Sequence, residues 1–222
     1  MRDTDVLIVG GGLSGTLLAM QLLRLPGARH IVVVEPRAEL GRGEAYSATE
    51  LGHTLNGNAA RMSVEPDDAD DLTRWLQAHI DGGGWPESGV QPVPVAELFP
   101  PRGLFGLYAQ QRLAQALAVG ERNGSSLTHV RDEVVDLQTL AHGVRVMLKH
   151  GEPLQAGGAV LATAHTTGNS RSARTPETCW ALSARSSPST PAVFWRPLWS
   201  SVRRHRARRR YRRATSAGYC QP

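Results

Sequence analysis

The sequence predicts an α/β fold built on a parallel sheet, and three observations predict it. An apolar run at 6–9, rich in β-branched residues, leads directly into a glycine-rich turn. A helical pattern of leucines follows the turn and ends at Pro26-Gly27. A second apolar run, at 31–34, ends in an acidic residue, Glu35. This order of strand, glycine turn, helix and strand is typical of Rossmann-like βαβ units.

The turn reads G-x-G-x-x-G at the point where the strand pattern becomes a helix pattern. Its first glycine permits the tight turn, its second lets a pyrophosphate approach the backbone, and its third lets helix and strand pack closely. The N-terminus of the helix supplies free N–H groups and a positive dipole end for that pyrophosphate. The candidate cofactor-binding residues of this turn are Gly10, Gly12, Leu13, Ser14 and Gly15.

Glu35 lies 20 residues after Gly15, at the end of the second predicted strand. A carboxylate in that place accepts hydrogen bonds from the ribose hydroxyls of an adenine dinucleotide and repels a 2′-phosphate. FAD and NAD both satisfy this requirement. The residues alone therefore leave open an FAD-binding domain and an NAD-binding dehydrogenase-type domain, and a βαβ unit that binds no ligand is a third alternative.

Further elements are expected along the chain. An acidic stretch at 66–71 begins a helix that ends at the glycines 82–84, and we interpret its aspartates as helix-start acids rather than a cation site. A second helix is expected from 104 to about 121. Strand-like pieces follow at 130–137 and 143–149, and a short buried strand at 159–163. The carboxyl edge of that last strand is where ligands sit in open α/β sheets.

Length and composition limit the class of protein. The 222 residues allow one full domain with, at most, part of a second. The sequence has neither a run of 18 apolar residues nor the features of a signal peptide, so we expect a cytoplasmic protein without a membrane span. Cys179 and Cys220 form neither a metal-ligand spacing nor a disulfide framework, and we expect no metal site.

Charge divides the chain at about residue 165. Residues 1–165 hold 13 Lys and Arg against 19 Asp and Glu, whereas residues 166–222 hold 12 arginines against one acid. The apolar periodicity also ends there. We therefore assign 1–165 to a partial dinucleotide-binding domain and 166–222 to an irregular, Arg- and Ser-rich basic tail. We expect this tail to be disordered or a non-native end, such as a frameshifted or truncated reading of a longer gene.

A functional basic tail is the alternative. The arginines between Arg203 and Arg213 would bind phosphate backbones by counterion release, which would make the chain a non-catalytic dinucleotide-binding module with a nucleic-acid-binding tail. We do not expect a nucleic-acid partner, because no aromatic stacking platform accompanies these arginines in the sequence. A membrane-bound amphipathic helix is not expected either, since no apolar face is sustained. The sequence leaves the oligomeric state open.

Two further segments complete a recognisable pattern: G-R-G-E-A-Y-S at 41–47 and a polar loop at 53–63. Together with the glycine turn, Glu35 and the strand end at 160–165, they make the chain resemble flavoprotein oxidoreductases with two dinucleotide-binding domains. The resemblance is to the bacterial FAD/NAD(P)-binding proteins, which include flavin-dependent N-hydroxylating monooxygenases. It covers roughly the first three-quarters of the chain.

The resemblance implies that FAD is the cofactor and that NAD(P)H is the co-substrate of a full-length relative. It implies that the glycine turn holds the FAD pyrophosphate and that Glu35 binds the adenosine ribose. It places the segments at 41–47 and 53–63 along the FAD, and one strand pair near the adenine. The candidate cofactor contacts that it adds are Arg42, Gly43, Asn56, Arg61, Met62, Val134 and Thr163.

The chain departs from the family pattern near its last predicted strand. Ala164 replaces the glycine of the usual A-T-G, and its methyl group could loosen the contact between backbone and cofactor. Family members also continue with a nicotinamide-binding region, and we see no second glycine-rich fingerprint here. We therefore expect this chain to bind FAD poorly and to turn over NAD(P)H slowly or not at all. Its substrate cannot be read from the sequence.

No catalytic residue is assigned from the sequence. A flavin performs the redox chemistry itself, so that no side-chain nucleophile is required. His53 and His165 are the histidines near the proposed cofactor segments. We interpret both as structural residues rather than as general acids or bases.

Overall fold

The computed structural model describes residues 4–85 and 93–163. Within them, six strands form one sheet in the order β3-β2-β1-β6-β5-β4. The strands are β1 (Thr4–Val9), β2 (His30–Val34), β3 (Ser126–Val130), β4 (Val134–Thr139), β5 (Val144–Leu148) and β6 (Leu154–Leu161). The helices are α1 (Leu13–Arg24), α2 (Asp71–Asp81) and α3 (Arg102–Arg122), with 3-10 turns η1 (Ala59–Arg61) and η2 (Val95–Glu97). The predicted α/β fold is confirmed, because β3, β2, β1 and β6 run parallel.

The central strands explain the apolar runs in the sequence. β1 pairs in parallel with β2 on one edge and with β6 on the other, so that its backbone is hydrogen-bonded on both sides. Ile8 is buried in the core that the sheet shares with the helices, whereas Leu7 and Val9 are buried in a second core on the opposite face. A strand buried on both faces has no need of polar alternation.

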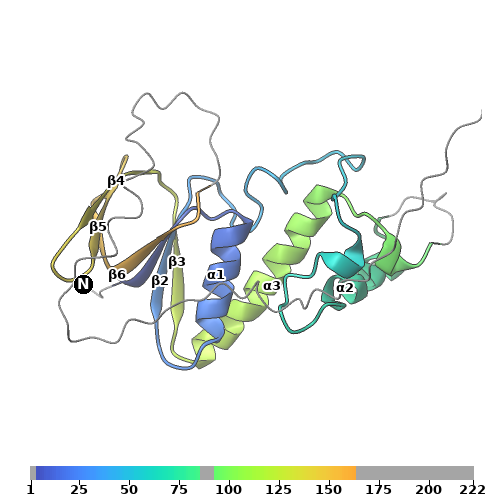
Figure 1. Ribbon diagram of the computed structural model, residues 1–222, viewed down its shortest axis with the longest axis horizontal. Coiled ribbons are helices and arrows are strands. Elements are labelled where there is room, and N and C mark those ends of the chain that lie inside the picture. The colour runs from blue at the N-terminus through green and yellow to red at the C-terminus, as the bar shows by residue number, and fades with distance from the viewer. Residues whose placement is uncertain (1–3, 86–92, 164–222) are drawn as a thin grey trace, which may run out of the picture. The chain divides into compact units, whose positions relative to one another are not determined.

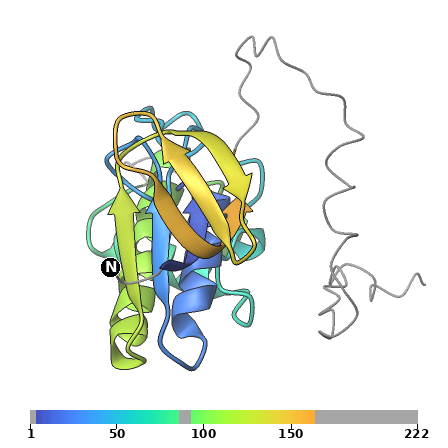
Figure 2. The ribbon, with the colours of Figure 1, turned by 90° about the vertical axis from the view of Figure 1, so that its left-hand side faces the viewer.

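Two layers cover the two faces of the parallel strands. α1 and α3 lie on one face, and β4 and β5 lie on the other (Figure 1). Figure 2 shows the same arrangement with β4 and β5 in front and the helices behind. β6 belongs to both parts, because its Ala156 pairs antiparallel with Val144 and parallel with Thr4.

The structure corrects the prediction of one strand over 130–137. β3 ends at Val130, and β4 begins only at Val134. Between them the carboxylate of Asp132 accepts hydrogen bonds from three backbone N–H groups, of Glu133, His150 and Gly151. This turn interrupts the strand. The edge strand β3 was missed because its sequence, S-L-T-H-V, mixes polar and apolar residues.

The other predicted element boundaries differ less from the observed ones. The strand predicted at 159–163 is the end of β6, which begins five residues earlier at Leu154. α2 begins at Asp71, the last residue of the acidic stretch 66–71, and α3 matches its predicted range closely. In the described ranges no helix has the length and apolar character needed to cross a membrane. The same residues contain no cluster of His, Cys, Asp or Glu able to hold a metal ion.

Several predictions concern residues that the structure does not describe. The boundary expected at 165/166, the basic tail, Ala164, His165 and both cysteines lie outside the described residues. These expectations stay predictions.

Candidate dinucleotide site

The glycine turn joins β1 to α1 at the carboxyl end of the parallel strands. Gly10 adopts φ +102°, a conformation that side chains rarely allow, and its N–H donates to the carbonyl of Val34 at 2.9 Å. A Cβ on Gly15 would lie 1.9 Å from the carbonyl oxygen of Gly10. The first and third glycines are therefore required for the turn and for the close contact between helix and strand.

Gly12 has a different environment. Among the residues that the structure describes, a Cβ on Gly12 would meet only the Cα of Gly43, at 3.7 Å, so that these residues leave the space in front of this backbone open. Gly12 is the N-cap of α1, and that helix has neither a side-chain hydrogen bond at its cap nor an acidic residue in its first turn. The first N–H groups of a helix lack intrahelical acceptors. This helix start, which includes Leu13 and Ser14, is therefore free to bind an anion.

Glu35 is held beside the turn rather than left in solvent. It is 4% exposed, and its Oε2 accepts a hydrogen bond from the N–H of Gly11 at 2.8 Å. Its Oε1 accepts the N–H of Arg37 at 3.1 Å, and its own carbonyl contacts Nε2 of His129 at 2.9 Å. The structure thus places the predicted ribose carboxylate next to the predicted pyrophosphate site.

Three residues of this arrangement were missed in the sequence. Gly11 lies inside the motif, but the motif gives its N–H no role. Arg37 follows Glu35 by two residues, a weak signal on its own. His129 comes from β3, which the sequence did not reveal, so that no local pattern could have joined it to Glu35.

The segment around Arg42 lies beside the turn. A Cβ on Gly43 would lie 3.1 Å from the Cα of Gly12, and the N–H of Gly41 donates to the carbonyl of Gly11 at 2.9 Å. The segment 41–43 is therefore fixed to the glycine turn by backbone contacts. The resemblance placed both segments along one cofactor, and the structure brings them together.

The Arg42 side chain extends from this segment to α3. Its Nη2 donates to the carbonyl of Gly103 at 3.3 Å, and its Nε lies 3.6 Å from a carboxylate oxygen of Glu39. Nε is buried, and in the described residues it has no hydrogen-bond partner. A buried guanidinium N–H without a partner is costly, and a bound anion or carbonyl would satisfy it.

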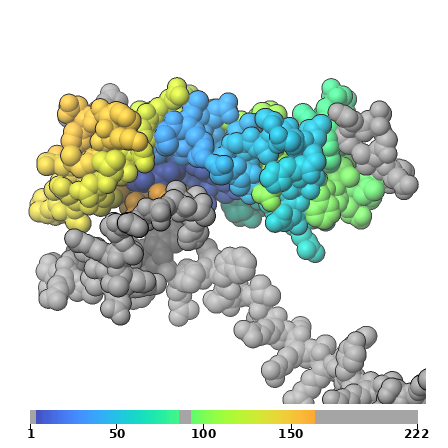
Figure 3. Space-filling model, turned by 90° about the horizontal axis from the view of Figure 1, so that it is seen from above, coloured from blue at the N-terminus to red at the C-terminus, as the bar shows by residue number. Residues whose placement is uncertain are grey.

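The loop 53–63 reaches the same end of α3. Oδ1 of Asn56 accepts a hydrogen bond from Arg102 at 2.9 Å, and the N–H of Leu55 donates to Pro100 at 2.9 Å. Arg42 and Asn56 therefore both contact the first turn of α3. In the view from above, the blue and cyan segments that carry the two loops lie next to one another (Figure 3).

The remaining candidates are placed less uniformly. Arg61 is exposed, whereas Met62 is partly buried, with its Sδ 3.0 Å from the position of a Cβ on Gly57. The backbone N of Thr163 lies 3.4 Å from the Cβ position of Gly10, beside the turn. Val134 packs into the second apolar core, and its contact with an adenine stays a prediction. The side chain of His53 is exposed, and its interpretation as a structural residue stays a prediction.

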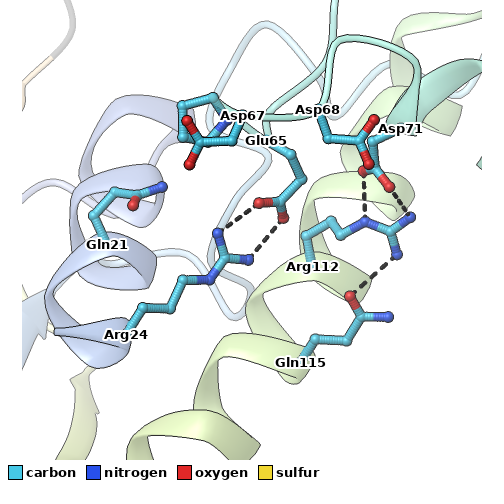
Figure 4. Close-up of a pocket in the computed structure, with 9 residues that line it drawn as sticks. Gln21, Arg24, Glu65, Asp67, Asp68, Asp71, Arg112 and Gln115 are labelled. Carbon is cyan, nitrogen blue, oxygen red and sulfur yellow. Dashed lines mark hydrogen bonds and ion pairs between the residues drawn. The ribbon is translucent and has the colours of Figure 1, made fainter. Parts of the chain in front are cut away.

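This set of groups suits a dinucleotide. It offers free N–H groups at a helix start, a fixed carboxylate beside them and a guanidinium with an unsatisfied donor, which match a pyrophosphate, a ribose and a further acceptor. A separate cavity of about 490 Å³ lies elsewhere, between α1, α3 and the segment 65–71 (Figure 4). Its charged side chains are mostly paired with one another, so we do not assign the dinucleotide to it.

The solved structures to which this chain is similar have low sequence identity to it. A flavin-containing monooxygenase from Stenotrophomonas maltophilia is 22% identical, with 73% of this chain and 39% of that chain covered at a TM-score of 0.44. The bacillithiol disulfide reductase Bdr from Staphylococcus aureus is 14% identical, with 74% and 39% covered at 0.44. OTEMO in complex with FAD and NADP is 15% identical, with 74% and 26% covered at 0.43.

The chain spans less than half the length of these structures. No curated protein sequence matches it. The family model described as FAD-NAD(P)-binding, however, matches residues 7–166. That range contains the glycine turn, Glu35, the Arg42 segment and the loop 53–63. The chain belongs to the FAD-NAD(P)-binding family.

Proposed function

We propose that this chain is the FAD-binding part of an NAD(P)H-dependent oxidoreductase. One observation carries the proposal: α1 begins at an open, uncapped Gly12, and the buried carboxylate of Glu35 is fixed 2.8 Å from the N–H of Gly11. The family supports FAD as the ligand of this site. A cytoplasmic location is part of the proposal, because the reductant would come from the NAD(P)H of the cell.

Different residues would bind different parts of the cofactor. The helix start at Gly12 would hold the pyrophosphate, Glu35 would accept the ribose hydroxyls, and Nε of Arg42 would donate to an acceptor farther along the cofactor. When bound, the flavin would accept a hydride from a reduced nicotinamide and pass the electrons on to oxygen or another acceptor. The resemblance to N-hydroxylating enzymes extends the proposal to monooxygenation of a small molecule by the whole protein.

Absorption spectroscopy of the full chain tests the proposal. After incubation with excess FAD and rapid removal of free flavin, we expect a weak flavin band, and the titration should saturate only at high FAD concentration. NAD in excess should not displace the flavin. Absence of a flavin band together with measurable NAD binding would contradict FAD and favour an NAD-binding dehydrogenase-type domain. Brisk NADPH oxidation would contradict our expectation of weak turnover by this chain.

A pair of variants connects binding to the glycine turn. Gly12→Val should abolish FAD uptake, because its side chain would occupy the position of the pyrophosphate. The thermal midpoint of the ligand-free protein should change little, since the space in front of Gly12 is open. Gly52→Val is the matched control: among the described residues its Cβ meets no atom within 4 Å, and it should bind FAD like the wild type. Equal FAD binding by Gly12→Val and the wild type would remove the turn from the site.

A further inference from the structure

The segment that follows Met62 is tied to a buried tyrosine. The hydroxyl of Tyr108, on α3, accepts a hydrogen bond from the N–H of Val64 at 3.2 Å and donates one to Oδ2 of Asp71 at 2.6 Å. Arg112, one turn farther along α3, donates to both carboxylate oxygens of Asp71, at 2.7 and 2.9 Å. We call Tyr108, Asp71 and Arg112 the anchor cluster.

Burial gives each group of the anchor cluster one role. Tyr108 is fully buried and Asp71 is 8% exposed. Burial, together with the hydrogen bond to Asp71, raises the pKa of Tyr108 to about 12, so that the hydroxyl keeps its proton and donates it. Burial alone would raise the pKa of Asp71, but the hydrogen bonds from Arg112 and Tyr108 outweigh it and the pKa is lowered. The hydroxyl is therefore an acceptor for Val64.

The tyrosine ring cannot easily move away from this position. It packs against Phe105 and Trp75, with ring centroids 5.7 and 5.4 Å apart, and the guanidinium of Arg112 lies 5.1 Å from its centroid. Cation–π and aromatic contacts of this kind restrain the ring in addition to the hydrogen bonds. The acceptor offered to Val64 thus has a fixed place in the fold.

Neighbouring residues strengthen the attachment of the same segment. Arg24 of α1 forms two hydrogen bonds with the carboxylate of Glu65, at 2.5 and 2.7 Å (Figure 4). The hydroxyl of Ser63 donates to the carbonyls of Glu65 and Asp68. Residues 63–65 are therefore tied directly to α1 and α3, and through Tyr108 to Asp71 of α2, immediately after Arg61 and Met62 of the candidate cofactor loop.

We propose that Tyr108, oriented by Asp71 and Arg112, is a positioning residue that fixes the loop carrying Asn56, Arg61 and Met62 against the cofactor. This inference rests on the proposed function, because it assumes that the loop borders FAD. Asp71 and Arg112 line the adjoining cavity, and Tyr108 holds the end of the loop through its hydrogen bond with the N–H of Val64. When a loop that contacts a ligand is already ordered in the free protein, less conformational entropy is lost on binding, and the affinity for the ligand is higher.

Tyr108→Phe separates positioning from packing, because it keeps the ring and removes only the hydroxyl. Two measurements on the full chain are needed: amide hydrogen exchange of Val64 by NMR without ligand, and the dissociation constant for FAD. We expect the Val64 amide to exchange at least about tenfold faster and FAD to bind about tenfold more weakly. Amides of β1 and β2 should exchange as in the wild type.

Gln111→Ala is the matched control. Gln111 also joins α3 to α2, through a 2.6 Å hydrogen bond from Nε1 of Trp75, but in the described part of the chain no hydrogen bond joins its side chain to 63–65. We expect its Val64 exchange and FAD affinity to equal those of the wild type. If Tyr108→Phe fails to fold, Arg112→Lys takes its place, because it keeps the charge but cannot reproduce both bonds to Asp71. Its effects should be smaller and in the same direction.

The outcomes distinguish the two proposals. Unchanged Val64 exchange in Tyr108→Phe, or in Arg112→Lys where it replaces that variant, would overturn the anchor. Faster exchange with unchanged FAD affinity would overturn the positioning role while leaving the proposed function intact. A wild type that binds no FAD would overturn the proposed function, and the positioning role with it. Equal effects in Gln111→Ala would show a general loosening of the helices and would also overturn the proposal.

Discussion

The two ends of α1 differ in whether their hydrogen-bonding groups have partners within the protein. At its N-terminus the helix begins at Gly12 with no side-chain cap, and the described residues leave the space in front of the backbone open. Near its C-terminus Arg24 is paired with Glu65, and across the cavity Arg112 is paired with Asp71. Both regions are rich in hydrogen-bonding groups. They differ in whether those groups already have partners within the protein.

This difference separates a binding region from a structural one. N–H groups at an accessible helix start form hydrogen bonds with water when no ligand is bound. They are stabilised further when an anion binds. Charges that are already paired and partly buried would have to break those pairs to bind anything, at a cost of several kcal/mol. We therefore expect substitutions at the first end to affect ligand binding, and substitutions at the second end to affect stability. Gly15, which packs against the strand, is the exception at the first end.

The largest effect is expected for Gly15→Ala. The new Cβ would lie 1.9 Å from the carbonyl oxygen of Gly10, and both atoms belong to the backbone frame of the turn. We expect the free energy of unfolding to fall by about 3 kcal/mol or more, measured by urea denaturation. Gly12→Ala is the control from the same motif and should cost less than about 1 kcal/mol. Equal losses at the two glycines would mean that the turn does not pack as described.

The next effect concerns the anchor cluster. Asp71→Asn keeps the shape of the side chain but leaves the guanidinium of Arg112, only 13% exposed, without its counter-charge. We expect a loss of about 2–3 kcal/mol in the free energy of unfolding. Asp68→Asn is the control, because its ion pair with Arg74 is exposed and should contribute no more than about 1 kcal/mol. Similar losses of stability in the two variants would show that the mostly buried ion pair contributes no more than the exposed one.

The smallest effect on stability is expected from Asp132. Like Asp71, its carboxylate is hydrogen-bonded to other groups of the protein. Hydrogen bonds from the backbone N–H of Glu133 and from His150 lower the pKa of its carboxyl from 3.8 to about 2. A depressed pKa means that the folded state holds the proton less tightly than the unfolded state. The ionised carboxylate therefore makes its full contribution to the free energy of unfolding above about pH 4, and this contribution is lost as the pH falls towards 2.

Urea midpoints measured from pH 6 to pH 2 test this contribution. The wild type should lose more stability over the acid range than Asp132→Asn, and the difference between the two proteins should shrink as the pH falls from 4 to 2. The subtraction removes the effect of Asp71, which titrates in both proteins. Parallel pH profiles would show that the turn between β3 and β4 does not depend on the ionised carboxylate.

Much of the fold could be predicted because its signals are local. The apolar runs of β1 and β2, the glycines between them and the acid at the end of β2 all fall within 35 residues of sequence. Strand, turn and helix formation there depends on near neighbours, and the third glycine is required by a contact with the first. The same reasoning found α3 and β5 close to their observed ranges.

Tertiary structure decided the rest. β3 is a polar edge strand that exists because it pairs with β2, and so His129 could not be connected to Glu35 beforehand. The meeting of Arg42 and Asn56 at the first turn of α3 joins residues 46 or more positions apart. Tyr108 had no sequence signal at all, since its role is a hydrogen bond to a backbone N–H 44 residues away. Local sequence determined where the backbone turns and which faces are apolar, but hydrogen bonds between distant segments form only after the chain has packed, and these decided how the loops of the site are held.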